Sequence, residues 1–243
     1  MTKLNGKRVA VIGGTSGIGF AVAEAALRDG AHVIVGSSNG ANVDAAVARL
    51  GDRTVGWPVD VREESSVADF FARIGRFDHL VYTAGDWALN RGGGPVSQLD
   101  LAAGHATFTV RFWGALAAIK HAQGSIAADG SVTITDGVIA HRPRKGAALS
   151  TAMAGAIEHL TRALAVDLAP VRVNAVCPGY VLTEVWNSIP EERRAAQLAK
   201  MTQRLPVPRV GLPGEIAEAY LYLMRGGYAT GLVLVVDGGM TLI

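Results

Sequence analysis

Cysteine is almost absent from this chain of 243 residues. Cys177 is the only one, so no disulfide can form within the chain, and a lone thiol suits a reducing compartment. Long apolar runs are missing too. No stretch reaches the ~18 apolar residues that suggest a membrane helix. The apolar run after Lys7 and Arg8 is broken by glycines, which argues against a secretory signal. We therefore expect a cytoplasmic protein without a membrane partner.

The sequence also has little excess of charge. Its formal net charge is +2, and there is no basic stripe of the kind that binds nucleic acid, so a nucleic-acid partner is not expected. Linker-like stretches, repeats and low-complexity segments are lacking as well. The chain is therefore expected to form one domain over residues 1–243, with a small lid or substrate region at about 184–210.

What the sequence does have is a regular alternation of short apolar runs and longer amphipathic segments. Runs of strand length are expected at residues 8–13, 32–36, 54–57, 79–83, 131–135, 171–176 and 232–236. Helices are expected at residues 17–29, 42–50, 63–74, 99–123, 147–168 and 213–225, with one or two short ones in 186–204. Strands that are apolar on both faces and alternate with helices indicate an α/β Rossmann fold, a doubly wound parallel sheet of about seven strands with helices on both faces.

A glycine-rich segment joins the first strand to the first helix. Residues 13–19 read Gly-Gly-Thr-Ser-Gly-Ile-Gly. Glycine allows a sharp turn and lets a diphosphate approach the backbone, and the helix amino terminus behind it offers unpaired N–H groups and a positive dipole end. The position of the glycines, after a strand and before a helix, predicts a dinucleotide site rather than an ordinary turn.

Together with four later motifs, this segment resembles the short-chain dehydrogenase/reductase family over essentially the whole chain. The family's first motif begins with threonine, where this chain has Ile12. The other matching motifs are Val59-Asp60-Val61, Thr83-Ala84-Gly85 (with threonine for asparagine), Pro178-Gly179-Tyr180-Val181-Leu182-Thr183 and Val236-Asp237-Gly238-Gly239. The resemblance implies cofactor contacts from the phosphate loop, the adenine side and the nicotinamide side. The predicted residues are Gly13, Thr15, Ser16, Gly17, Ile18, Gly19, Ser37, Ser38, Asn39, Asp60, Val61, Thr83, Ala84, Gly85, Pro178, Gly179, Val181 and Thr183.

The end of the second strand bears on the choice of dinucleotide. A carboxylate there would bind the ribose 2′-OH and repel a 2′-phosphate. Residues 35–39 contain no acid but offer Ser37, Ser38 and Asn39 as donors; the usual arginine is absent as well. The pattern favours NADP(H), and NAD(H) is the alternative cofactor. The purely structural interpretation is that residues 37–40 form an ordinary turn.

The catalytic groups that the resemblance implies are missing. The family uses a tyrosine as proton donor, a lysine that lowers the tyrosine pKa, a serine that orients the carbonyl and an asparagine that positions water. No tyrosine lies between Tyr82 and Tyr180, so a shift of the alignment cannot restore the donor. The four equivalent positions, in the same order, hold Leu149, Met153, Asp136 or Gly137, and Arg111.

Three side chains are candidates to act instead. Arg111 can stabilise an oxyanion or bind a substrate carboxylate, unless it forms a structural ion pair, with Asp136 for example. Asp136 ends the fifth strand, where burial can raise its pKa and make it an acid, unless it caps a turn. His141 titrates near neutral pH and begins a basic loop, 141–146, that can meet an anionic substrate or simply be solvated. Tyr180 lacks a nearby lysine and is expected to pack, and no metal site is predicted.

Three functions remain open at this stage. The first is an NADP(H)-dependent oxidoreductase with a non-standard catalytic site, acting on a small molecule such as one with a polarised C=C or C=N bond. The second is a non-catalytic sensor or scaffold that binds a dinucleotide, and the third is a non-redox enzyme on the same fold. The glycine-rich loop at 86–96 is expected to form a rim of the pocket. The resemblance implies a homo-oligomer, a dimer or, as we expect, a homotetramer, and helix faces rich in Ala and Gly at 114–122 and 155–165 would allow close helix packing.

Overall fold

A computed structural model describes residues 4–85 and 94–243, so most of the expected rim loop at 86–96 lies outside the described part. The predicted Rossmann fold is confirmed. Seven parallel strands lie in the order β3-β2-β1-β4-β5-β6-β7. The strands are β1 (Arg8–Ile12), β2 (His32–Ser37), β3 (Thr54–Pro58), β4 (Phe77–Tyr82), β5 (Ile126–Thr135), β6 (Arg172–Pro178) and β7 (Val233–Val236).

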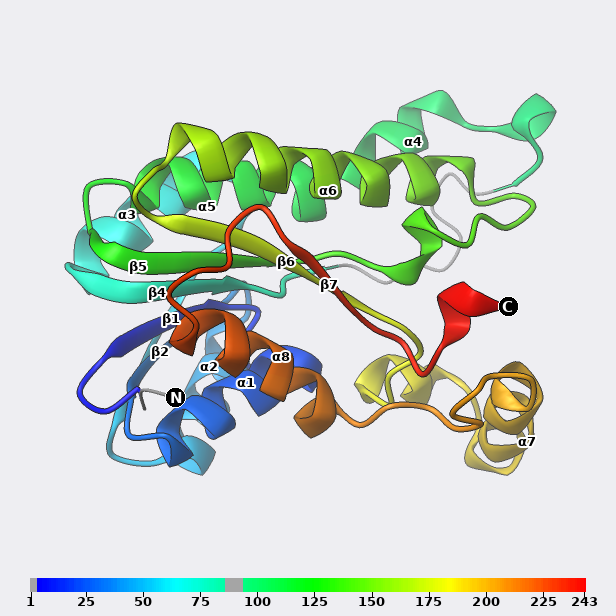
Figure 1. Cartoon of the computed structure of the whole chain (residues 1–243), viewed down its shortest axis with the longest axis horizontal. Coiled ribbons are helices and arrows are strands. Elements are labelled where there is room, and N and C mark those ends of the chain that lie inside the picture. Colours follow the sequence, from blue (N-terminus) through cyan, green and yellow to red (C-terminus); the bar gives the residue numbers. More distant parts are fainter. Residues whose placement is uncertain (1–3, 86–93) are drawn as a thin grey trace.

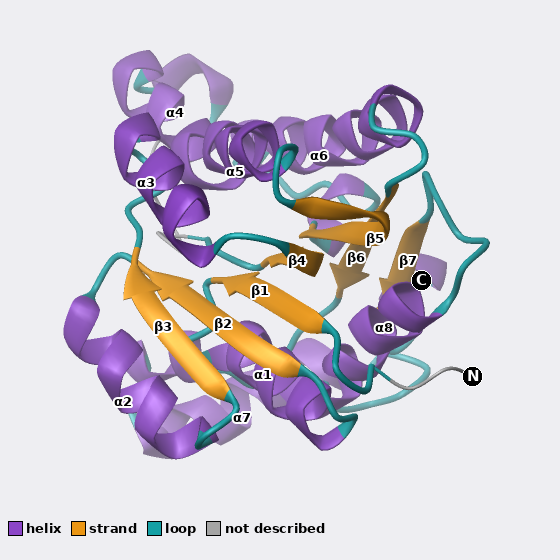
Figure 2. Cartoon of the chain, turned by 90° about the vertical axis from the view of Figure 1, so that its left-hand side faces the viewer, coloured by secondary structure: helices purple, strands orange, loops and turns teal. Residues whose placement is uncertain are grey.

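Helices cover both faces of this sheet, as Figure 2 shows edge-on. One face carries α1 (Gly17–Arg28), α2 (Gly40–Leu50) and α8 (Pro213–Arg225), and its core includes Val22, Val33 and Tyr220. The other carries α3 (Glu64–Ile74), α5 (Gly114–Ala122) and α6 (Ala148–Asp167) over Phe70, Leu80 and Ile157. Because both faces are covered, the strands are apolar throughout, which is the pattern that the sequence shows.

The expected long helix at 99–123 is interrupted. It consists of α4 (Leu101–Phe108), a π-helical segment (Thr109–Trp113) and α5. Such wide turns often occur at functional sites, and this one carries Arg111. The other clear difference is β5, which starts at Ile126, five residues before the predicted start at 131.

The chain between β6 and α8 forms a separate small lobe beside the carboxyl ends of the strands, seen at the lower right of Figure 1. It contains a 3-10 helix (Glu184–Ser188) and α7 (Glu191–Thr202). A parallel bridge between Val181 and Gly211 joins the two ends of this segment. The lobe coincides with the region expected to be a lid, and that role stays a prediction. Within residues 4–85 and 94–243, no helix has both the length and the apolar character needed to cross a bilayer.

Candidate active site

A cleft of about 440 Å³ runs along the carboxyl ends of the strands. It is lined by the turns that follow β1, β2, β3, β4, β5 and β6 and by the π-helical segment. The sheet order reverses between β1 and β4, so α1 and α5 cover opposite faces next to this point. Open α/β sheets bind their ligands at such a switch point.

The phosphate loop at one end of the cleft is shaped by glycine. Gly13 and Gly17 have φ angles of +87° and +52°, which residues with a side chain rarely adopt. A Cβ at Gly13 would lie 2.6 Å from the Ala84 nitrogen, so only glycine fits. Ser16 precedes α1 without a capping bond from its side chain, so the first N–H groups of the helix are left for another acceptor.

Thr83 ties this loop to β4. Its Oγ1 donates to the carbonyl oxygens of Ile12 (3.1 Å) and Gly13 (3.3 Å), and its backbone N–H also donates to Ile12. Threonine thus reaches the carbonyl groups at the end of β1 from the position where the family has asparagine. The glycine cradle and the open helix terminus together fit a dinucleotide diphosphate.

The adenosine end of the cleft is lined by Ser37 and Ser38 after β2 and by Asp60 after β3. Asn39 does not line the cleft; it caps α2, and its Oδ1 accepts a bond from the Asn42 N–H at 3.2 Å. Arg62 does line it, 3.4 Å from Asp60. The sequence reasoning missed this cation because it lies after β3, not after β2. All other residues predicted to bind the cofactor line the same cleft.

Arg111 lies at the opposite end, on the π-helical segment, and lines the cleft. Its guanidinium packs directly over Gly85: a Cβ at Gly85 would lie 2.8 Å from Arg111 Nη2. The absence of a side chain at Gly85 leaves the space that this guanidinium occupies. The arrangement brings a delocalised cation to the nicotinamide side, where it can stabilise negative charge on a substrate.

Asp136 follows β5 and lines the cleft, yet it is only 3% exposed. In the described part of the chain neither carboxylate oxygen accepts a hydrogen bond, from Arg111 or from any other residue, so the structure shows no hydrogen-bonded pair of the kind that the sequence left open as an alternative. Burial, reinforced by the neighbouring Glu158 carboxyl, raises the pKa of Asp136 to about 7. A carboxyl group with this pKa is partly protonated at neutral pH, unlike an ordinary aspartate, and its protonated form can donate the proton.

His141 does not line the cleft. It lies behind Asp136, with Nε2 2.6 Å from Glu158 Oε1. Glu158 was missed by sequence reasoning, because an acid in the middle of an amphipathic helix suggests a solvated face. Its spacing from buried Ala154 and Thr161 was the available signal, since residues three and four apart share one face of a helix.

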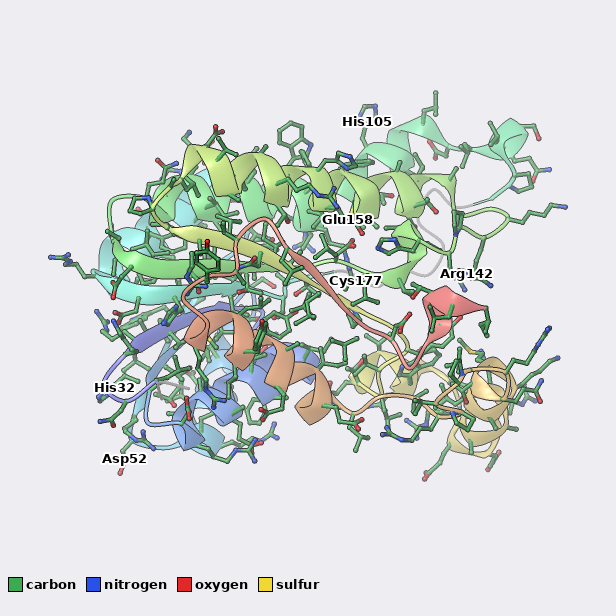
Figure 3. The ribbon with its side chains drawn as sticks, in the orientation of Figure 1. His32, Asp52, His105, Arg142, Glu158 and Cys177 are labelled. Carbon is green, nitrogen blue, oxygen red and sulfur yellow. The ribbon has the colours of Figure 1, made fainter. Side chains whose placement is uncertain are left out.

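The positions at which the family has tyrosine and lysine are filled by apolar groups. Leu149 packs on Gly104, outside the cleft, whereas Met153 is buried and lines it. Tyr180 lines the cleft and also packs edge-on against Trp186, with ring centroids 6.4 Å apart. From the basic loop, Arg142 and Arg144 line the cleft, and Figure 3 shows Arg142 at the end of the molecule near the carboxyl terminus.

Comparison with known proteins gives a consistent result. A family model described as enoyl-(acyl carrier protein) reductase matches residues 12–241. The short-chain dehydrogenase/reductase ucsE of an Acremonium species is 38% identical over 256 residues, which span 98% of this chain and 96% of that protein.

Two solved structures extend the likeness to three dimensions. MalC reductase/Diels-Alderase from Malbranchea aurantiaca is 32% identical with a TM-score of 0.91, over 99% of this chain and 98% of that one. A small-chain dehydrogenase in complex with NADPH is also 32% identical, with a TM-score of 0.80 over 98% of this chain and 100% of that one. The cleft described above thus occurs in a fold of which one member has been solved with NADPH.

Proposed function

This chain belongs to the short-chain dehydrogenase/reductase family, and we propose that it is an NADPH-dependent reductase of a polarised C=N or C=C bond. Arg111 and Asp136 take the place of the family's usual catalytic groups. One observation carries the proposal: a cation and a neutral buried carboxyl line the same cleft as the phosphate loop and the segment Pro178–Thr183.

Three features support NADPH as the cofactor. No carboxylate follows β2, where it would repel a 2′-phosphate. Ser37 and Ser38 offer hydroxyl donors, and Arg62 adds a cation to the same cleft. A relative with the same fold binds NADPH. The bound nicotinamide would supply a hydride, and the protein's part is to orient the substrate and to manage charge and protons.

The two side chains divide this work by their chemistry. Arg111 keeps its charge at every accessible pH, so it stabilises negative charge on the substrate but is a poor proton donor. Asp136 is buried, and because its pKa is raised to about 7, a substantial fraction of it carries a proton at neutral pH and can deliver the proton that completes the reduction. Such a pair suits imines and conjugated alkenes, and the names of the matched family model and of MalC point to reductases.

A second candidate is a non-redox reaction in the same cleft, because MalC is named a Diels-Alderase as well as a reductase. Arg111 and Asp136 can activate a polar substrate through charge and hydrogen bonding without a hydride. This activity would persist in cofactor-free protein, which separates it from reduction. A sensor without catalysis would bind NADPH and transform no substrate.

The test is single-turnover absorbance with excess enzyme, NADPH or NADH, and a panel of cyclic imines, enones and ketones. We expect NADPH to be oxidised by imines or enones, and Arg111→Ala and Asp136→Asn each to slow the reaction by roughly 10²–10⁴-fold while NADPH still binds. Arg111→Lys is the matched control that keeps the charge but loses the planar fork. Tight cofactor binding with no oxidation across the panel would contradict the proposal.

A further inference from the structure

Four side chains of metal-binding or acid–base type meet beneath the floor of the cleft. They come from the turn after β5 (Asp136), the turn after the 3-10 helix Val138–Ala140 (His141), α6 (Glu158) and β6 (Cys177). Their ligand atoms all lie within 4.8 Å of one another. Figure 3 shows Glu158 on α6 above the strand that carries Cys177. The proposed reductase function uses only the first of the four.

Keeping two neighbouring buried carboxyl groups ionised at the same time costs free energy when no cation lies between them. Asp136 and Glu158 are 3% and 7% exposed, and Asp136 has no hydrogen-bond partner in the described part of the chain. Glu158 has basic side chains on its outer side: His141 Nε2 lies 2.6 Å from Oε1, and Arg162 Nη2 lies 3.7 Å from Oε2. Asp136 is the group whose pKa is raised, by burial and by the Glu158 carboxyl.

The cluster connects the cleft to solvent. Asp136 lines the cleft, Glu158 lies beyond it, and the His141 side chain is 38% exposed to water. Asp136, Glu158 and His141 thus form a line of titratable groups from the substrate side to the outside. After Asp136 has given up its proton, this line of groups offers a path from solvent that does not pass through the substrate and cofactor in the cleft.

We infer that Glu158 and His141 form a proton relay that recharges Asp136 between turnovers. The inference rests on the proposed function. As the hydride adds to one atom of the double bond, the Asp136 O–H bond breaks and its proton forms a bond to the other atom. The His141 imidazolium then passes a proton through Glu158 to the Asp136 carboxylate, and water reprotonates His141. The relay gains and loses no electrons.

The same four side chains are also ligand types for zinc, and the geometry argues against that use. Two atoms bound to one tetrahedral zinc at about 2.0 Å lie about 3.3 Å apart, whereas His141 Nε2 and Glu158 Oε1 are 2.6 Å apart. Burial raises the pKa of the Cys177 thiol, so the thiolate that zinc prefers is disfavoured. The two side chains are in direct contact with each other, with no room for an ion between these two atoms.

The charged and titratable groups around the relay set its pH response. Besides Asp136 and His141, Glu158 faces Arg162 one turn along α6 and Cys177 on β6. On the far side, Tyr220 of α8 interacts electrostatically with Asp136 and Arg111, and Asp237 with Cys177. Of these neighbours, Glu158 has a carboxyl group close enough to raise the pKa of Asp136. The change Glu158→Gln removes this acid while keeping the shape of the side chain.

The experiment compares His141→Asn and Glu158→Gln with the exposed controls His159→Asn and Glu218→Gln. Below pH 7, where Asp136 starts protonated, we expect His141→Asn to slow steady-state turnover roughly tenfold or more and the first turnover far less, with imidazole in the buffer restoring the rate. If His141→Asn slowed the first turnover as much as steady-state turnover, or slowed neither, the relay would be overturned. The controls should match the wild type in both measurements.

Glu158→Gln gives a second readout that does not need a substrate. Loss of the Glu158 charge lowers the pKa of Asp136. The infrared C=O band of protonated Asp136, identified by its loss in Asp136→Asn, should then disappear at lower pH than in the wild type. If the band titrated at the same pH in Glu158→Gln as in the wild type, the relay would be overturned. It would also be overturned if the wild type bound stoichiometric zinc and Glu158→Gln did not. If none of the substrates tested oxidises NADPH on the wild type, the reductase proposal fails. A shift of the Asp136 band in Glu158→Gln would then still show that the two carboxyl groups are coupled.

Discussion

The two ends of the cleft differ in whether backbone or side-chain groups form their surface. At the phosphate end the binding surface is backbone: glycines at positive φ, an uncapped helix terminus and a threonine that fixes the loop. At the reaction end it is side chains, Arg111 held over Gly85 and Asp136 buried beside Glu158. The backbone surface matches the family pattern, whereas the side chains depart from it. The difference indicates that a fold can keep its cofactor site while the acid that completes the reaction is replaced.

The largest effect is expected at the reaction end. Asp136→Asn keeps the shape of the side chain but removes the acidic proton, so the turnover number should fall by roughly 10²–10⁴-fold. Calorimetry should show the affinity for NADPH unchanged within about twofold, because the phosphate end is untouched. A variant that lost affinity and turnover together would show that the two ends are not separable.

The reverse result is expected at the phosphate end. A Cβ at Gly19 would collide with the Gly13 carbonyl group, so Gly19→Ala should weaken NADPH binding by roughly 100-fold. Gly40→Ala is the matched control, because no atom lies within 4 Å of its added Cβ and α2 gains a better helix former. Circular dichroism checks that both variants fold, and equal NADPH affinity in the two would contradict the role of the cradle.

A smaller effect should sharpen the choice of cofactor. Ser37 is the last residue of β2 and lines the cleft, so Ser37→Asp places a carboxylate where a 2′-phosphate would be repelled. We expect the dissociation constant for NADPH to rise about tenfold or more and that for NADH to stay or fall. Asn39→Asp adds the same charge at the cap of α2, outside the cleft, and should change the preference little. If both variants behaved alike, the net charge alone would explain the result.

The smallest effect is on stability. Because the folded pKa of Asp136 is raised, the folded chain holds a proton that the unfolded chain releases between about pH 4 and about pH 7. The free energy of unfolding of the wild type should therefore fall across this window relative to Asp136→Asn. At about pH 8 the variant should be more stable by about 1–3 kcal/mol in urea unfolding, and near pH 4 the gap should close. A gap independent of pH would mean that Asp136 is not held neutral by the fold.

The two ends also differ in how well the sequence predicts them. The strands, the phosphate loop and most of the cleft residues follow from local patterns, because buried strands are apolar and tight turns need glycine. Asn39 was misplaced because a side chain that caps a helix and one that lines a cleft have the same composition. The π-helical turn at Thr109–Trp113 has no local signature. Glu158 and its contact with His141 arise from packing between distant segments.

The most direct test of the central claim is the pH dependence of a single turnover of NADPH oxidation under saturating substrate. If buried Asp136 supplies the proton, the rate constant should be level below about pH 7 and fall about tenfold per pH unit above it, and Asp136→Asn should lack this titration. A rate constant that stays level well above pH 7, or a variant as fast as the wild type, would contradict the account.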